Sequence, residues 1–295
     1  MRVFLTGATG FIGSRIVPEL IAAGHQVLGL ARSDTSARAL QAMGAGVYRG
    51  TLDQPETLRD GAAQSDAVIH TAFDHDFSHF AANCEKDRQV IRVLGDALKG
   101  SHRPLLITSG TAMGERGNGQ PATEDGFSAD LTNPRVLSEL EGDKWLDEGV
   151  DVRFVRLPQV HDTVRQGLIT PYIEIARQKG IVAYIGAGNN RWPAAHVTDV
   201  ATLYVLALTR GEKGKRYHAV AQEGIAMREI AQIVSERLGL PQVSLTASQS
   251  PAHFGWFAFF ADKDLTASGA WTRLQLGWTP TGPGLLEDLG KINIE

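Results

Sequence analysis

The chain has a single cysteine, Cys84, among its 295 residues. One cysteine excludes a disulfide within the chain and any metal site built from several cysteines. Long apolar runs are also missing, because no stretch approaches the ~18 apolar residues of a membrane-spanning helix. The chain begins directly with a predicted strand, which leaves no room for a signal peptide. We therefore expect a cytoplasmic protein with no membrane partner.

Blocks of like charge are absent as well. Lys and Arg together number 29, Asp and Glu number 33, and the formal net charge is −4. This balance argues against nucleic acid as a partner, since that would favour a basic surface. The hydrophobic content of 43% is that of a globular protein of one large or two ordinary domains. We expect a small molecule as the partner, with a homodimer left open.

The first sixteen residues, MRVFLTGATGFIGSRI, change from a strand pattern to a helix pattern. A short apolar run at residues 3–5 predicts a buried parallel strand, and apolar residues at helical spacing begin at Ile12. The change from one pattern to the other takes place across three glycines, Gly7, Gly10 and Gly13. Such a turn lets backbone N–H groups approach a pyrophosphate at the start of a helix. The segment predicts a dinucleotide site; the alternative is a glycine-rich turn that binds nothing.

The end of the second predicted strand, residues 26–30, indicates which dinucleotide binds. An acidic residue there would bond the ribose hydroxyls of NAD and repel a 2′-phosphate. This chain has Ala31, Arg32 and Ser33 instead. Because a guanidinium binds phosphate well, we predict NADP, with NAD possible. The alternative is an exposed arginine that begins the next helix.

Four further apolar runs predict strands, at residues 46–49, 66–70, 104–108 and 152–157. Helical segments between them predict a doubly wound parallel sheet of the Rossmann type. Ligands of such sheets lie beyond the carboxyl ends of the strands. We therefore expect residues 50–53 beside the adenine, residues 70–72 beside the nicotinamide ribose, and residues 109–111 at the same edge. Asn133 and Pro134 predict the start of a helix that ends near Glu148.

The regular alternation ends after Pro158. We expect residues 1–157 and 191–221 to form the dinucleotide-binding domain, and residues 158–190 and 222–295 a smaller, mostly helical substrate domain. Seven aromatic residues lie between Phe254 and Trp278. They form either a lid over an apolar substrate or the core of the second domain.

Five motifs together resemble the extended short-chain dehydrogenase/reductase superfamily, in its NAD-dependent epimerase/dehydratase branch. They are TGATGFIG (6–13), DAVIH (66–70), ITSG (107–110), HVTD (196–199) and LGWTP (276–280). The resemblance implies a pyrophosphate turn at the three glycines, an adenosine-phosphate contact at Arg32, a catalytic serine at Ser109 and a discontinuous second domain. The expected cofactor contacts are Gly7, Thr9, Gly10, Phe11, Ile12, Gly13, Arg32, Ser33, Leu52, Thr71, Ala72, Phe73 and Thr108.

The chain departs from this family in its catalytic pair. Members use Tyr-x-x-x-Lys on the helix after the fifth strand, whereas here no tyrosine lies between residues 49 and 171. By spacing, Arg135 takes the place of the tyrosine and Glu139 that of the lysine. An arginine cannot donate a proton at neutral pH but can stabilise a developing alkoxide. We expect Glu139 to hold Arg135 or to relay a proton; the alternative is a surface salt bridge. The expected catalytic residues are Ser109, Thr111, Arg135 and Glu139.

Two histidines, His75 and His79, stand four residues apart beside Asp74 and Asp76. This spacing could ligate a metal from one helical face, but there is no HExxH pattern and no obvious third ligand, so we predict no metal. A solvated loop and a substrate contact both remain open.

Three functions are consistent with the sequence. The first is an NADP-dependent oxidoreductase that acts on a carbonyl or alcohol group of a small molecule. The second is an epimerase or dehydratase that keeps its nucleotide bound. The third is a non-catalytic sensor of NADP.

Overall fold

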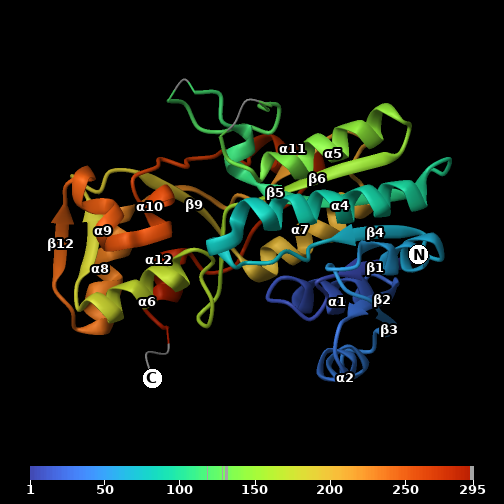
Figure 1. Ribbon diagram of the computed structural model, residues 1–295, viewed down its shortest axis with the longest axis horizontal. Helices are drawn as coiled ribbons and strands as arrows, with labels where there is room; N and C mark the ends of the chain where they lie inside the picture. The colour runs from blue at the N-terminus through green and yellow to red at the C-terminus, as the bar shows by residue number, and fades with distance from the viewer. Residues whose placement is uncertain (118, 128, 130–131, 293–295) are drawn as a thin grey trace.

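The centre of the molecule is a parallel sheet of seven strands, in the order β10-β6-β5-β4-β1-β2-β3 (Figure 1). The computed structural model describes the whole chain except residues 118, 128, 130–131 and 293–295. The strands of the sheet are β1 (Arg2–Thr6), β2 (Gln26–Ala31), β3 (Gly46–Arg49), β4 (Ala67–His70), β5 (Pro104–Gly110), β6 (Asp151–Leu157) and β10 (Arg216–His218). The strand order reverses between β1 and β4, which confirms the doubly wound Rossmann fold.

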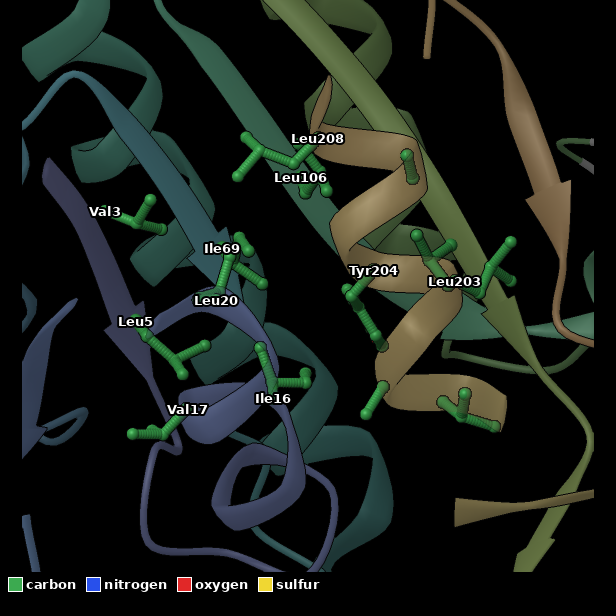
Figure 2. Close-up of a cluster of buried hydrophobic side chains, with 14 of the residues drawn as sticks. Val3, Leu5, Ile16, Val17, Leu20, Ile69, Leu106, Leu203, Tyr204 and Leu208 are labelled. Atoms are coloured by element: carbon green, nitrogen blue, oxygen red, sulfur yellow. The ribbon is translucent and has the colours of Figure 1, made fainter. Parts of the chain in front are cut away.

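Helices cover both faces of the sheet because successive strand residues point to opposite sides. Val3 and Leu5 of β1 pack on one helical layer and Phe4 on the other. Figure 2 shows the first layer, in which Ile16 and Leu203 lie on two different helices beside the strands. That layer consists of α1 (Gly13–Ala22), α2 (Asp34–Ala42) and α7 (Val197–Thr209). The opposite layer consists of α3 (Arg59–Ala63), α4 (Phe80–Leu98) and α5 (Val136–Asp147).

The second region has its own apolar core, centred on Tyr172, Trp192 and Phe257. It contains helices and two small sheets, β11-β9-β7 and β12-β8, although the sequence predicted mostly helix and loop. Its main elements are β7 (Gln159–His161), α6 (Ile169–Lys179), β8 (Val182–Ile185), β9 (Arg191–His196), β11 (Gln222–Ala226), α8 (Met227–Leu238), β12 (Gln242–Leu245), α9 (Ser250–Phe254), α10 (Ala258–Ala261) and α12 (Leu285–Leu289). Helix α11 (Ala270–Leu276) packs against the core of the central sheet instead, through Leu276. Among the described residues, no helix is long and apolar enough to cross a membrane.

One predicted helix start differs from the observed one, and a second helix is capped by a histidine. Helix α5 begins at Val136 rather than at Pro134, and the side-chain oxygen of Asn133 accepts the backbone amide of Arg135 at 3.0 Å. Helix α7 is capped by His196, since the Asp199 carboxylate accepts the amides of Thr281 and Gly282 instead. Asp199 thereby holds the C-terminal segment against the sheet.

Candidate cofactor and active site

The glycine turn after β1 has the geometry that a pyrophosphate requires. Gly7 has φ +69°, and a Cβ there would lie 2.8 Å from the amide nitrogen of Ala72. At Gly13 a Cβ would lie 2.1 Å from the carbonyl oxygen of Gly7, so both positions require glycine. The amides of Phe11 and Ile12, at the start of α1, find no backbone acceptor in the part of the chain that the structure describes. They are free to bind an anion.

The loop after β4 lies against this turn. The Thr71 hydroxyl donates to the carbonyl oxygen of Thr6 at 2.8 Å, and the amide of Ala72 donates to the Thr6 hydroxyl at 3.3 Å. Thr6 ends β1 and directly precedes the glycine turn, so the second predicted cofactor segment is hydrogen-bonded to the strand end from which the first one begins.

A cavity of about 360 Å³ opens beside these segments. Four of the predicted cofactor residues line it: Thr9, Arg32, Leu52 and Phe73. Gly50, Thr51 and Asp53, from the segment expected beside the adenine, line it as well. Its lining also includes five residues that the sequence did not predict: Leu30, Ser36, Asp74, His75 and Lys86. The cavity therefore spans the carboxyl ends of β1 to β4, where the fold places the adenosine half of a dinucleotide.

Arg32 is the exposed cation of this cavity. Its guanidinium has no ion-pair or hydrogen-bond partner among the described residues, whereas the neighbouring Arg49 pairs with Asp34 at 2.5 Å. Ser33 is engaged locally, because its hydroxyl caps α2 by accepting the amide of Ser36 at 3.2 Å. Ser36, rather than Ser33, lines the cavity, and its hydroxyl donates to the carbonyl oxygen of Ser33 at 2.9 Å.

Lys86 reaches across the cavity from α4. Its ammonium group lies 2.7 Å from a carboxylate oxygen of Asp53 and 3.2 Å from one of Asp74. The hydrogen bond and the positive charge of Lys86 lower the pKa of Asp53. No local pattern predicts this contact, since the three residues come from separate elements that only the sheet brings together.

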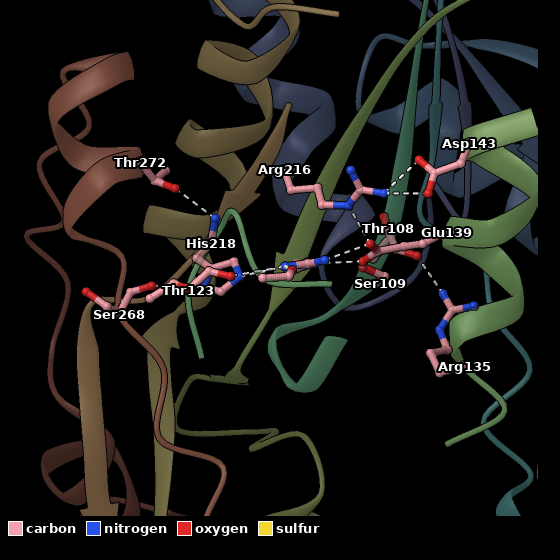
Figure 3. A network of polar contacts seen from close by, with 12 residues as sticks. Thr108, Ser109, Thr123, Arg135, Glu139, Asp143, Arg216, His218, Ser268 and Thr272 are labelled. Atoms are coloured by element: carbon pink, nitrogen blue, oxygen red, sulfur yellow. Dashed lines mark hydrogen bonds and ion pairs between the residues drawn. The ribbon is translucent and has the colours of Figure 1, made fainter. Parts of the chain in front are cut away.

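The position of the family's catalytic lysine holds a fully buried carboxylate. Glu139 and Arg156 are both 0% exposed, and the two side chains form a bidentate ion pair with both contacts at 2.8 Å. Arg216 contacts the same carboxylate at 2.8 Å, and the Ser109 hydroxyl donates to it at 2.5 Å (Figure 3). Burial opposes ionisation of Glu139, but its arginine partners and the serine lower its pKa on balance. The Glu139 carboxylate is therefore anionic and saturated with donors.

Arg135 lies in a separate network, so the expectation that Glu139 holds it is wrong. Its guanidinium donates to Asp87 at 2.6 Å, to Ser138, and to the carbonyl oxygen of Thr108 at 2.7 Å. The surface salt bridge is wrong too, because Arg135 is only 12% exposed and Glu139 is buried. Burial works against a negative charge on Asp87, but Arg135 and His70 hold its pKa well below the usual range.

One face of Arg135 remains next to the cofactor region. Its guanidinium carbon lies 4.3 Å from the ring centre of Phe73, which lines the cavity. Its Nε–H group donates to none of the described residues. Arg135 is thus a fixed cation that lies against Phe73, next to the cavity.

The other predicted residues lie deeper in the molecule. The Thr108 hydroxyl donates to the carbonyl oxygen of His70 at 2.7 Å and contacts the Tyr204 hydroxyl at 2.6 Å, so it points into the core. Thr111 is 4% exposed. Burial raises the pKa of Cys84 to about 11, which keeps its thiol protonated and unreactive at neutral pH.

The two neighbouring histidines have different surroundings. His79 is exposed and bonds Asp76 at 3.0 Å, whereas His75 lines the cavity. Within the described ranges, no group of three histidine, cysteine or acidic residues is arranged to hold a metal ion. His75 is therefore the one of the two that is placed to meet a ligand.

Comparison with known proteins identifies the family of this chain. The model of the NAD dependent epimerase/dehydratase family matches residues 3–220. The chain belongs to this family. An uncharacterized protein of Schizosaccharomyces pombe, C2A9.02, is 44% identical over 98% of both chains.

Other similar proteins are more distant. A 4-hydroxy-2-methyl-3-oxo-4-farnesyl-3,4-dihydroquinoline-1-oxide ketoreductase of Stigmatella aurantiaca is 26% identical, over 86% of this chain and 80% of its own. The dTDP-glucose 4,6-dehydratase DesIV of Streptomyces venezuelae, solved with NAD bound, superposes with a TM-score of 0.77 over 99% of this chain and 95% of its own, at 19% identity. At that identity the likeness to DesIV shows the fold alone.

Proposed function

We propose that the protein is an NADP-dependent oxidoreductase that acts on a carbonyl or alcohol group of a small molecule without a Tyr-x-x-x-Lys pair. The observation that carries the proposal is Arg32, a cation with no ion-pair partner among the described residues, in the wall of the cavity where the adenosine ribose would lie. An acidic residue at this strand end would favour NAD, whereas a guanidinium favours the 2′-phosphate of NADP. The Stigmatella relative, named a ketoreductase, supports the reaction class.

The residues around the cavity fit this cofactor. The free amides at Phe11 and Ile12 would bind the pyrophosphate, and Arg32 with Ser36 would bind the adenosine phosphate. Arg135 and the loop at Thr71 to Phe73 would lie towards the nicotinamide. When bound, the nicotinamide supplies or accepts the hydride, which is chemistry that no side chain offers.

Arg135 is the residue that we assign to the substrate oxygen. Its guanidinium is held by Asp87, Ser138 and the Thr108 carbonyl, so it would need no reorganisation as negative charge develops on that oxygen. The Ser109 hydroxyl is committed to Glu139. We therefore assign Ser109, Thr111 and Glu139 a structural role, without contact to the substrate.

Two alternative functions are consistent with the site. An epimerase or dehydratase would retain its nucleotide through purification, as the alternating oxidation and reduction in such enzymes requires. A sensor would bind NADPH without turnover. The observation that favours it is Arg135, which stands at the position of the family's proton-donating tyrosine, pairs with Asp87 and cannot donate a proton at neutral pH.

The experiment that tests the proposal measures NADPH oxidation over a panel of aldehydes and ketones, after the purified protein has been checked for retained nucleotide. We expect turnover, and Arg135→Ala should lower kcat by about 10² to 10³, as loss of an oxyanion-stabilising donor does. The dissociation constant of NADPH should change little. Arg92→Ala, which removes a more exposed arginine paired with Glu141, is the control. NADPH binding without turnover over the whole panel would favour the sensor.

A further inference from the structure

A continuous series of aromatic rings leads from Arg135 to the surface. We define the aromatic bridge as Phe73, Phe77, Phe80, Trp256 and Phe260. Phe73 lies under Arg135 and its ring centre is 6.3 Å from that of Phe80. The Phe80 ring is 5.4 Å from Phe77, and Phe77 stacks on Trp256 at 4.9 Å with an angle of 4° between the ring planes.

The aromatic bridge joins the two regions of the molecule. Phe73 and Phe77 belong to the loop between β4 and α4, at the cofactor edge of the sheet. Trp256 and Phe260 belong to the segment from α9 to α10 in the second region, and the Phe260 ring lies 6.0 Å from that of Phe77. The contact between Phe77 and Trp256 thus lies where the two regions meet, outward of Arg135 and the cavity.

These rings differ from the aromatic residues of the core beside them. Phe254 and Phe257 are 3% and 0% exposed and fill the centre of the second region. Trp256, from the same segment, is 39% exposed. Phe73, Phe77, Phe80 and Phe260 are half-buried. Of the seven C-terminal aromatics, two therefore fill the core of the second region, two belong to the partly exposed aromatic bridge, and one is exposed beside it; the last two, Trp271 and Trp278, pack against the core of the central sheet.

We propose that the aromatic bridge binds the body of the substrate, and that the substrate is a carbonyl compound that carries an aromatic ring system. This inference rests on the proposed function, because it takes Arg135 as the contact of the substrate oxygen. Phe77 and Trp256 already cover one face of each other, so a planar ring would stack on the outer face of this pair, where Trp256 is 39% exposed, with the same parallel geometry. The apolar part of the bound substrate then extends from Arg135 towards Trp256.

The test is the binding of 2-acetylnaphthalene to the protein saturated with NADP⁺, measured by titration calorimetry. We expect Trp256→Ala to weaken binding by about tenfold, since an aromatic pair and its buried area contribute roughly this much. Phe259→Ala is the matched control: Phe259 is also 39% exposed in the same segment, but Phe77 stacks on Trp256 and contacts Phe260 instead. This control should bind within about twofold of wild type. Phe77→Leu tests the same contact from the other region, with thermal unfolding to show that each variant folds.

Three results would overturn the inference: no binding of 2-acetylnaphthalene by wild type, equal affinity in Trp256→Ala and wild type, or tighter binding of UDP-glucose than of the aromatic ketone. Failure of the proposed function gives a different pattern. In that case 2-acetylnaphthalene binds in a Trp256-dependent way but NADPH is not oxidised. Conversely, if small polar carbonyls are reduced at equal rates by wild type and Trp256→Ala, the function stands and the aromatic site is rejected.

Discussion

The two ends of the candidate site are built in opposite ways. At the adenosine end, a cavity of about 360 Å³ is lined by Arg32, which has no partner among the described residues. At the place of the family's catalytic pair, Glu139 is buried and bonded to Arg156, Arg216 and Ser109. One end leaves a charge free for a ligand, whereas the other neutralises its charges internally.

This difference indicates which features of the family fold the chain keeps for binding. A buried ion pair stabilises little relative to an apolar pair, but losing one partner leaves a charge unpaired in the interior. The Glu139 network should therefore control stability and leave nucleotide affinity unchanged. The glycine turn and Arg32 should do the reverse.

The largest expected effect is on stability. Glu139→Gln removes the charge that Arg156 and Arg216 share, and should lower the free energy of unfolding by about 3 to 5 kcal/mol. Glu148→Gln, which breaks an exposed pair with Lys99, should cost less than about 1 kcal/mol. Urea unfolding measures both variants. If Glu139→Gln costs no more than Glu148→Gln, the buried network is not a stabilising element.

The next effect concerns the glycine turn. Gly10→Glu places a side chain and a negative charge where the pyrophosphate would lie, so NADPH affinity should fall by about a hundredfold or more. Some loss of stability accompanies the substitution, because a Cβ at Gly10 would lie 3.1 Å from the Gly7 carbonyl oxygen and the turn must shift by a few tenths of an ångström. Calorimetry with Gly10→Ala as the smaller substitution checks this. Unchanged affinity in Gly10→Glu would remove the pyrophosphate assignment.

A smaller effect depends on pH. Burial, with the charge of Arg156, lowers the pKa of His218 to about 3. Between pH 6.5 and pH 3 the unfolded chain binds a proton at this residue and the folded chain does not. Stability should therefore fall as the pH falls, by about 1.4 kcal/mol per pH unit from this group.

The test of this effect replaces His218 with a residue that cannot take up the proton. His218→Gln should reduce the loss of stability between pH 6.5 and pH 4.5, measured by urea unfolding at both values. His102→Gln, at an exposed position, should leave the loss as it is in wild type. Equal slopes in wild type and His218→Gln would contradict the account of a buried neutral histidine.

Sequence patterns predicted the parallel sheet because its strands are local apolar runs. Residues 46–49 match β3 without a shift, and β1, β2, β4, β5 and β6 differ by at most a few residues. The short strands β11 and β12 were missed because they carry polar residues or glycine and pair only with the edges of small sheets. Their pairing depends on tertiary contacts that a local pattern does not contain.

The candidate site, like the fold, was predicted only in part. The glycine turn and Arg32 could be found because they lie within one strand, turn and helix. The partners of Glu139 lie 17 and 77 residues away, at Arg156 and Arg216. Lys86, across the cavity from Asp53, is also remote in sequence. Long-range ion pairs of this kind follow from the topology and have no signature in spacing.

The most direct measurement compares the dissociation constants of NADPH and NADH for wild type, Arg32→Ala and the control Arg59→Ala, a surface variant on α3. Wild type should bind NADPH at least about tenfold more tightly, since hydrogen bonds to a charged group contribute about 1.5 to 3 kcal/mol. Arg32→Ala should lose most of that preference while its NADH affinity stays within about twofold, and Arg59→Ala should behave as wild type. Wild-type binding of NADH as tight as that of NADPH would contradict the central claim.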